Sequence, residues 1–150
     1  MLKAKHVYHG DIKPEPNTIF VFGSNPEGRH GAGSARVAMM HFGAVYGKGE
    51  GLQGNSYAIP TIDLRKRGLR NISEVDIFNS CYKMYVTANM LKSYTFKVAY
   101  RSKADEATLC GYTGKELFLI FLAAYGKFCA DYNTTLDNIQ FSEEWSNIEL

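Results

Sequence analysis

The sequence predicts a single α/β layered domain, and three observations support this fold class. Short apolar, β-branched segments alternate with longer helical patterns along the chain. The chain has 150 residues, the size of one ordinary domain and enough to bury a core. Its composition, with 45% hydrophobic and 21% charged residues, is typical of a globular protein. We therefore expect one domain over residues 1–150, with its ligand at the carboxyl ends of the strands.

Apolar alternation predicts the strands, and helical periodicity predicts the segments between them. Strands are expected at residues 4–9, 18–24, 56–60, 95–101 and 137–142. Helices are expected over residues 33–43, 73–92 and 114–131. The second helix opens with Ser73 and Asp76 at capping-box-like spacing. Its apolar face is expected to consist of Val75, Phe78, Tyr82, Tyr85 and Val86. The third is almost wholly apolar in its middle, which indicates burial against the sheet.

Charge gives little indication of a nucleic-acid or membrane partner. The formal net charge of +2 is too small for a nucleic-acid footprint. The one basic cluster, Arg65-Lys66-Arg67 with Arg70, lies in the polar segment 61–72 and is interpreted as a solvated loop. The sequence has neither the apolar segment of a signal peptide nor a stretch of about 18 apolar residues, so we expect a cytoplasmic protein with no membrane partner.

The cysteines predict reduced thiols rather than disulfides or zinc. Cys81, Cys110 and Cys129 are an odd set without CxxC spacing, which is typical of a cytosolic protein. No metal site is expected. Cys110 has no histidine or asparagine partner near it in the sequence, so a nucleophilic role is not favoured.

Two glycine clusters compete as phosphate-binding turns. Residues 49–54, GEGLQG, match the G-x-G-x-x-G pattern but follow a predicted helix and lead into a strand, so a dinucleotide site is not favoured there. Residues 22–35, FGSNPEGRHGAGSA, follow a buried strand and open a helix, which is the arrangement that directs free amides at an anion. This stretch lacks the Lys-Ser/Thr pair of a P-loop, so triphosphate hydrolysis is not expected.

A third glycine-bearing loop repeats the strand-loop-helix arrangement. Residues 108–114, TLCGYTG, lie between the predicted strand 95–101 and the helix 114–131. Two such loops at one sheet edge could hold two linked phosphates from both sides, so a diphosphate ligand is favoured over a single phosphate.

Three ordered motifs in this sequence resemble the macro domain family of ADP-ribose-binding modules. Gly10-Asp11-Ile12 looks like the family's G-D-I-T. The stretch from Asn25 to Ala35 aligns on the end of N-A-A-N and the G-G-G-V-A turn, and Leu109-Cys110-Gly111-Tyr112 looks like the second glycine loop. The match covers roughly residues 6–125 and is most similar to the compact macro-domain-like proteins of tailed phages and some bacteria. It departs from the family at Phe22, Ala32 and Thr108, which puts catalytic competence in doubt more than binding.

The resemblance implies a fold, a ligand and a set of site residues. The implied fold is a three-layer α/β/α domain with a central mixed sheet, and no cofactor is implied. Asp11 would accept a hydrogen bond from the adenine amino group, and the two glycine loops would surround the diphosphate. The implied ligand-binding residues are Asp11, Ile12, Gly23, Ser24, Gly31, Ala32, Gly33, Ser34, Ala35, Leu109, Cys110, Gly111 and Tyr112.

Two hypotheses of different classes follow from the resemblance. In the first, the protein hydrolyses ADP-ribose 1''-phosphate or an ADP-ribosyl ester, with Asn25 on the distal ribose and His30 as the general acid or base. A phage-encoded chain would then act in the host cytoplasm. In the second, the protein binds ADP-ribose or a related adenine nucleotide without chemistry, and His30 only stabilises its loop. Arg29 is a further candidate to neutralise phosphate charge.

Overall fold

The computed structural model of the protein describes residues 6–149. In chain order the elements are β1 (Val7–Tyr8), β2 (Thr18–Ser24), α1 (Gly33–His41), β3 (Gly51–Gln53), β4 (Ser56–Pro60), α2 (Glu74–Met90), β5 (Thr95–Val98), α3 (Gly114–Tyr132), β6 (Ile139–Ser142) and α4 (Glu143–Ser146).

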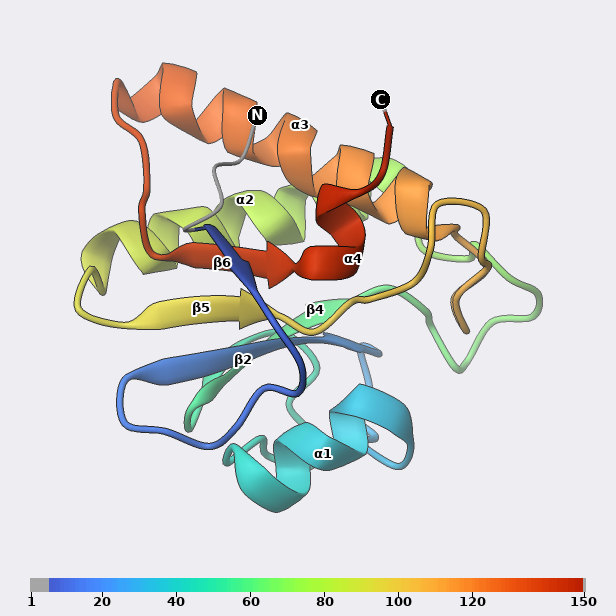
Figure 1. The fold of residues 1–150 in the computed structure, drawn as a ribbon. Coiled ribbons are helices and arrows are strands. Elements are labelled where there is room, and N and C mark those ends of the chain that lie inside the picture. The colour runs from blue at the N-terminus through green and yellow to red at the C-terminus, as the bar shows by residue number, and fades with distance from the viewer. Residues whose placement is uncertain (1–5, 150) are drawn as a thin grey trace.

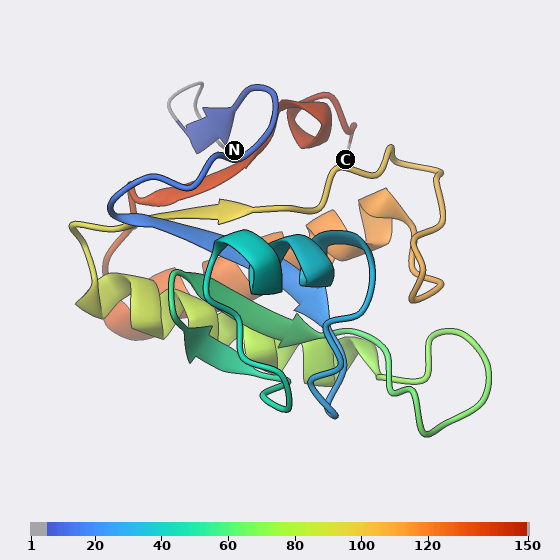
Figure 2. The ribbon, with the colours of Figure 1, turned by 90° about the horizontal axis from the view of Figure 1, so that it is seen from below.

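The strands of residues 6–149 form one mixed sheet between two layers of helices. The sheet has six strands in the order β1-β6-β5-β2-β4-β3, and every neighbouring pair is parallel except the antiparallel pair β3 and β4. Figure 1 shows α1 on one face of the sheet and α2 with α3 on the other. Seen from below, α1 lies in front of β2 and the long helices lie behind the sheet (Figure 2). The predicted three-layer α/β/α fold with a mixed central sheet is confirmed.

Strand β2 is buried on both faces, which explains its continuous apolar sequence TIFVF. Ile19 and Val21 contribute to the core under α2 and α3, whereas Phe20 and Phe22 contribute to the smaller core under α1. Alternate residues of a strand point to opposite faces, so a central strand of a three-layer domain needs apolar side chains at every position. β2 therefore lies at the centre of the fold, between β5 and β4.

Some expected boundaries were wrong. The strand expected at 95–101 ends at Val98, because the chain leaves the sheet there. The strand expected at 4–9 is β1, Val7–Tyr8, and its residues 4 and 5 lie outside the described part of the chain. Two elements were not expected: the short strand β3 and the one-turn helix α4. GEGLQG contains β3 and turns into β4 as an antiparallel hairpin, so it offers no helix N-terminus for a dinucleotide.

The buried face of α2 agrees with the expectation except at Val75. Its N-cap is as predicted, because the Ser73 side chain accepts a hydrogen bond from the Asp76 amide. Val75, however, is 66% exposed. Tyr85 lies in the core as predicted, and Phe78, Tyr82 and Val86 pack against it partly buried. The other core residues of α2 are Ile77, Cys81, Met84 and Ala88. Val75 precedes Ile77 by two positions, which is more than half a turn around the helix, so it points away from the sheet.

Candidate anion-binding site

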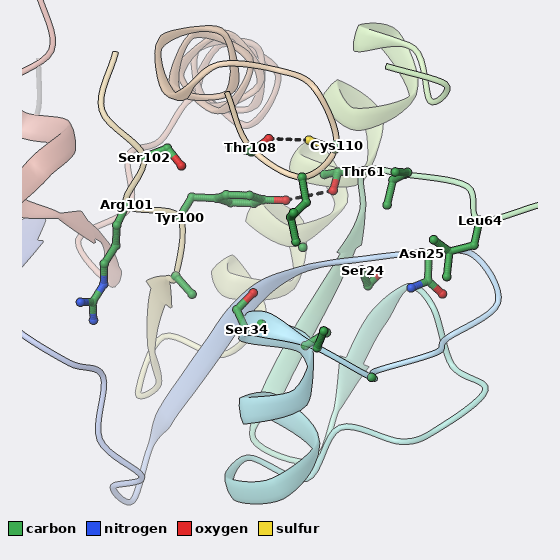
Figure 3. A pocket seen from close by; sticks show the side chains of 18 of the residues that line it. Ser24, Asn25, Ser34, Thr61, Leu64, Tyr100, Arg101, Ser102, Thr108 and Cys110 are labelled. Atoms are coloured by element: carbon green, nitrogen blue, oxygen red, sulfur yellow. Dashed lines mark hydrogen bonds between the residues drawn. The ribbon is translucent and has the colours of Figure 1, made fainter. Parts of the chain in front are cut away.

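The sheet has a topological switch point between β2 and β5. The connection from β2 to β4 passes through α1 on one face, and the connection from β5 to β6 passes through α3 on the opposite face. Connections that leave neighbouring parallel strands on opposite faces open a crevice at the carboxyl ends of those strands. A cavity of about 720 Å³ lies at this position (Figure 3), which is within the usual size range of small-molecule sites.

The cavity is lined by segments that follow three adjacent strands. Its lining residues are Gly23 and Ser24 at the end of β2, then Asn25, Arg29 and residues 31–35 after it; Thr61, Ile62 and Leu64 after β4; and residues 99–102 with 106–110 after β5. The two glycine-bearing loops of the sequence analysis therefore meet at one site. The strand ends bring together segments that are about 70 residues apart in the sequence.

One wall is the N-terminus of α1. Ala32 is the N-cap and gives no side-chain hydrogen bond, and the first turn holds no acidic residue. The first amides of a helix have no intrahelical acceptor, so those of Gly33 to Ala35 are free to donate to a ligand. Gly33 takes a left-handed φ of 59°, and a Cβ at Gly31 or Gly33 would meet no atom within 4 Å. The amides therefore border open space and favour an anion there.

The opposite wall is the loop 106–110, whose following helix is already capped. The Thr113 side chain accepts from the Glu116 amide, and the Glu116 carboxylate accepts from the Thr113 amide. The Thr108 hydroxyl donates to the Tyr112 carbonyl at 2.8 Å, which closes the loop on itself. We expected both glycine loops to offer open helix ends. In the structure only α1 does.

Two of the predicted binding residues support this loop instead of lining the cavity. Gly111 has a φ of 93°, and a Cβ there would lie 2.5 Å from Cβ of Leu69. Tyr112 is buried, donates its hydroxyl hydrogen bond to the Ile72 carbonyl at 2.7 Å, and lies under the Arg70 guanidinium. Both residues fasten the loop to the 69–72 segment.

The floor of the cavity is a pair of hydroxyls that sequence reasoning missed. Tyr100 Oη and Thr61 Oγ1 are 3.0 Å apart. Burial raises the pKa of Tyr100, so its hydroxyl is protonated at neutral pH. The pair lies over Gly23, where a Cβ would be 2.0 Å from Tyr100 Oη. Sequence reasoning could not find this contact, because it placed Tyr100 inside a strand at 95–101, whereas the strand ends at Val98.

Asn25 lines the cavity, but its amide is engaged with its own loop. Oδ1 accepts from the Arg29 amide at 2.9 Å, and Nδ2 donates to the Arg29 carbonyl at 3.0 Å. Ser24 is buried beside it and donates its hydroxyl to the Gly49 carbonyl. A Cβ at Gly49 would lie 2.3 Å from the Asn25 carbonyl oxygen, so the 47–49 turn approaches this loop closely.

His30 lies beneath the loop and is absent from the cavity lining. Its side chain is fully buried, and Nε2 lies 3.0 Å from the Val45 carbonyl and 3.1 Å from that of Lys48. Because both partners are acceptors, Nε2 carries the proton. Within residues 6–149, Nδ1 has no hydrogen-bond partner. The ring of Phe22, which departs from the family motif, packs edge-on against His30 with ring centroids 5.2 Å apart. His30 thus ties the 25–32 loop, which leads from β2 to α1, to the 45–48 turn.

Asp11 and Ile12 lie just outside the cavity. Ile12 is buried in the core on the α1 side. The Asp11 carboxylate is 90% exposed and pairs with Arg101, whose Nη2 is 3.2 Å from Oδ1. Nη2 of Arg101 also donates to the Gly10 carbonyl at 2.8 Å. Arg101 itself is a lining residue of the cavity, so the Gly10-Asp11-Ile12 motif contacts a residue of the site.

The charged groups of the lining are two arginines and one carboxylate. Arg29 stands beside the open helix end and Arg101 on the side of β5, whereas Glu106 comes from the opposite wall. Buried Cys110 has its Sγ 2.9 Å from Thr108 Oγ1. Two arginines, one carboxylate and helix amides without an intrahelical acceptor are the composition expected of an anion-binding site.

Scans against protein-family models, curated proteins and solved structures found no match for this chain. Among residues 6–149, no group of three or more His, Cys, Asp or Glu side chains could hold a metal ion. No helix in the same range is long and apolar enough to cross a membrane.

Proposed function

We propose that this protein binds ADP-ribose, or a derivative of it, with the diphosphate at the N-terminus of α1. The single observation that carries the proposal is the uncapped helix end at a switch-point cavity of about 720 Å³. The amides of Gly31 to Ala35 and the Arg29 guanidinium supply donors and positive charge for the phosphates. The resemblance to macro domains selects ADP-ribose among diphosphate ligands.

Calorimetric titration with ADP-ribose, AMP and NAD tests the proposal. ADP-ribose is expected to bind most tightly, and the affinity should fall as ionic strength rises. Arg29→Gln should weaken binding roughly threefold to tenfold, because it removes a charged donor from the cavity. Arg36→Gln is the matched control, since Arg36 is exposed on α1 and does not line the cavity. A wild-type protein that binds none of the three ligands would contradict the proposal.

A second candidate function is hydrolysis of ADP-ribose 1''-phosphate or of an ADP-ribosyl ester. One observation favours it: the lining carries a carboxylate, Glu106, in the same cavity as Asn25. His30 is fully buried and does not line the cavity, so Glu106, which does, is a better candidate for the group that takes a proton from water. Phosphate release by wild type, Glu106→Gln and His30→Gln tests this candidate. Loss of turnover in Glu106→Gln alone is expected, and absence of turnover in the wild type would exclude it.

A further inference from the structure

We propose that the paired hydroxyls of Thr61 and Tyr100 donate a hydrogen bond to the diphosphate from the floor of the cavity. This inference rests on the proposed function and adds a third contact surface to the two loop walls. It assigns to Tyr100 and Thr61 the role of affinity-determining residues for the diphosphate part of the ligand.

The first argument is the position of the pair. Thr61 follows β4 and Tyr100 follows β5, so the two hydroxyls come from the strands on either side of β2. Their side chains meet across the end of β2, where residue 23 has no side chain. Figure 3 shows the Tyr100 ring pointing toward Thr61, between Ser34 at the start of α1 and the loop that carries Thr108 and Cys110. A diphosphate held between the two walls would lie against this pair.

The second argument is a count of protons. The two hydroxyls carry two protons, and the hydrogen bond between them uses one. In the described part of the chain neither oxygen has a further hydrogen-bond partner. One hydroxyl proton is therefore left to donate, and both residues line the cavity. Phosphate oxygens accept such a hydrogen bond and, being charged, make it stronger than a neutral one.

The third argument is rigidity. The Tyr100 ring stacks on Trp145 with centroids 6.1 Å apart and an interplanar angle of 7°, and it meets Phe121 edge-on at 6.2 Å. Trp145 is fully buried and donates its indole N–H to the Ser102 carbonyl at 3.0 Å. The hydroxyl is thus fixed before the ligand arrives, so binding does not incur the entropy cost of ordering it. Trp145, on the one-turn helix α4, thus supports the site by holding the Tyr100 ring in place.

The test compares single and double hydroxyl deletions against two ligands. Tyr100→Phe, Thr61→Val and the double variant are titrated with ADP-ribose and with ADP, which share the diphosphate but differ in the distal ribose. Because either hydroxyl can turn its remaining proton to the ligand, the double variant is the strictest comparison. The double variant should bind each ligand about tenfold more weakly than wild type does, which is the loss expected for one hydrogen bond to a charged acceptor. The factor should be the same for ADP-ribose and ADP, because both carry the diphosphate.

Controls separate this contact from general damage to the fold. Tyr82→Phe removes a hydroxyl that donates to Asp131 on the surface between α2 and α3, and it should leave affinity unchanged. Thr61→Ser keeps a hydroxyl and should retain wild-type affinity. Unchanged affinity of the double variant, or a loss confined to ADP-ribose, would overturn the inference while leaving the proposed function intact. A wild type that binds neither ligand would overturn both.

Discussion

The side-chain amide of Asn25 closes on the backbone of Arg29 with two hydrogen bonds, one to its N–H at 2.9 Å and one from Nδ2 to its carbonyl at 3.0 Å. This contact holds the loop that leads from β2 to the open end of α1. Asn25 thus sets the loop geometry and borders the cavity at the same time.

Replacing Asn25 should therefore damage both stability and binding. Asn25→Ala removes both hydrogen bonds and is expected to lower the free energy of unfolding by about 1–3 kcal/mol. Asn25→Asp keeps an acceptor for the Arg29 amide but adds a negative charge beside the anion site, so it should lose more ligand affinity than Asn25→Ala. Urea denaturation and calorimetry on both variants measure the two effects. Equal affinities for the two variants would contradict a phosphate beside this loop.

A new N-cap on α1 should move stability and binding in opposite directions. Ala32→Asp places a carboxylate at the N-cap, where the protein has no capping side chain, so the helix should gain about 0.5–2 kcal/mol. The same carboxylate occupies the free amides, and binding of ADP-ribose should fall at least tenfold. Thermal melts and titrations check this pair of effects. A matched control is Thr113→Asp, because α3 is already capped and its N-terminus is not proposed to bind.

His30 should act through its loop rather than through proton transfer. His30→Ala leaves the Val45 and Lys48 carbonyls without their shared donor and opens a cavity, which should cost about 2–4 kcal/mol of stability. His30→Gln restores a donor and should recover part of this loss together with ligand affinity. Denaturant midpoints of the two variants measure the stability changes, and calorimetric titration measures the ligand affinity. An unchanged midpoint in His30→Ala would show that the 45–48 turn does not depend on the imidazole.

The contact between Gly23 and Tyr100 predicts a strong coupling between the two positions. Gly23→Ala brings a Cβ to 2.0 Å from Tyr100 Oη, so the tyrosine must move, and we expect a loss of about 1–3 kcal/mol. Tyr100→Ala alone should also destabilise, because it opens a cavity beside Trp145. In the double variant the steric conflict is absent, so its loss should be smaller than the sum of the single losses. Strict additivity would contradict the close approach.

The capping box of α3 predicts a pH dependence of stability. The pKa of Glu116 lies below its usual value, first because its carboxylate accepts the Thr113 amide and then because Arg70 donates to it at 2.7 Å. Stability from this group is therefore present above the unfolded pKa of about 4.3 and is lost as pH falls through the lower folded pKa. Glu116→Gln keeps the capping acceptor without the charge. The difference in urea midpoint between wild type and this variant should shrink between pH 7 and pH 3, and a constant difference would contradict the assignment.

Local sequence signals predicted the layers of the fold and the position of the site. The apolar run of β2, the Ser73 cap and the apolar middle of α3 each encode their element directly, because burial and capping depend on nearby residues. The expectation that 22–35 and 108–114 meet at one sheet edge depended only on strand-loop-helix order, and both segments contribute to the cavity.

Features that depend on contacts distant in sequence could not be predicted. The Thr61–Tyr100 pair joins residues 39 positions apart, and the burial of His30 depends on a turn 15 to 18 positions away. The 95–101 segment was expected to remain a strand because alternation continues past Val98. The chain leaves the sheet there, which directs Tyr100 and Arg101 to the site. Asp11 was assigned by resemblance, and only the three-dimensional structure shows that Arg101 stands between it and the cavity.

The measurement that tests the central claim most directly is a backbone amide NMR titration with ADP-ribose. The account predicts that the largest shift changes fall on the amides of Gly31 to Ala35, with smaller changes at Leu109 and Cys110 on the opposite wall. Saturation should be reached without change in the amide signals of residues on the exposed face of α2, such as Lys83. Shifts confined to residues outside the cavity, or no shifts at millimolar ligand, would contradict the claim that the open end of α1 binds the diphosphate.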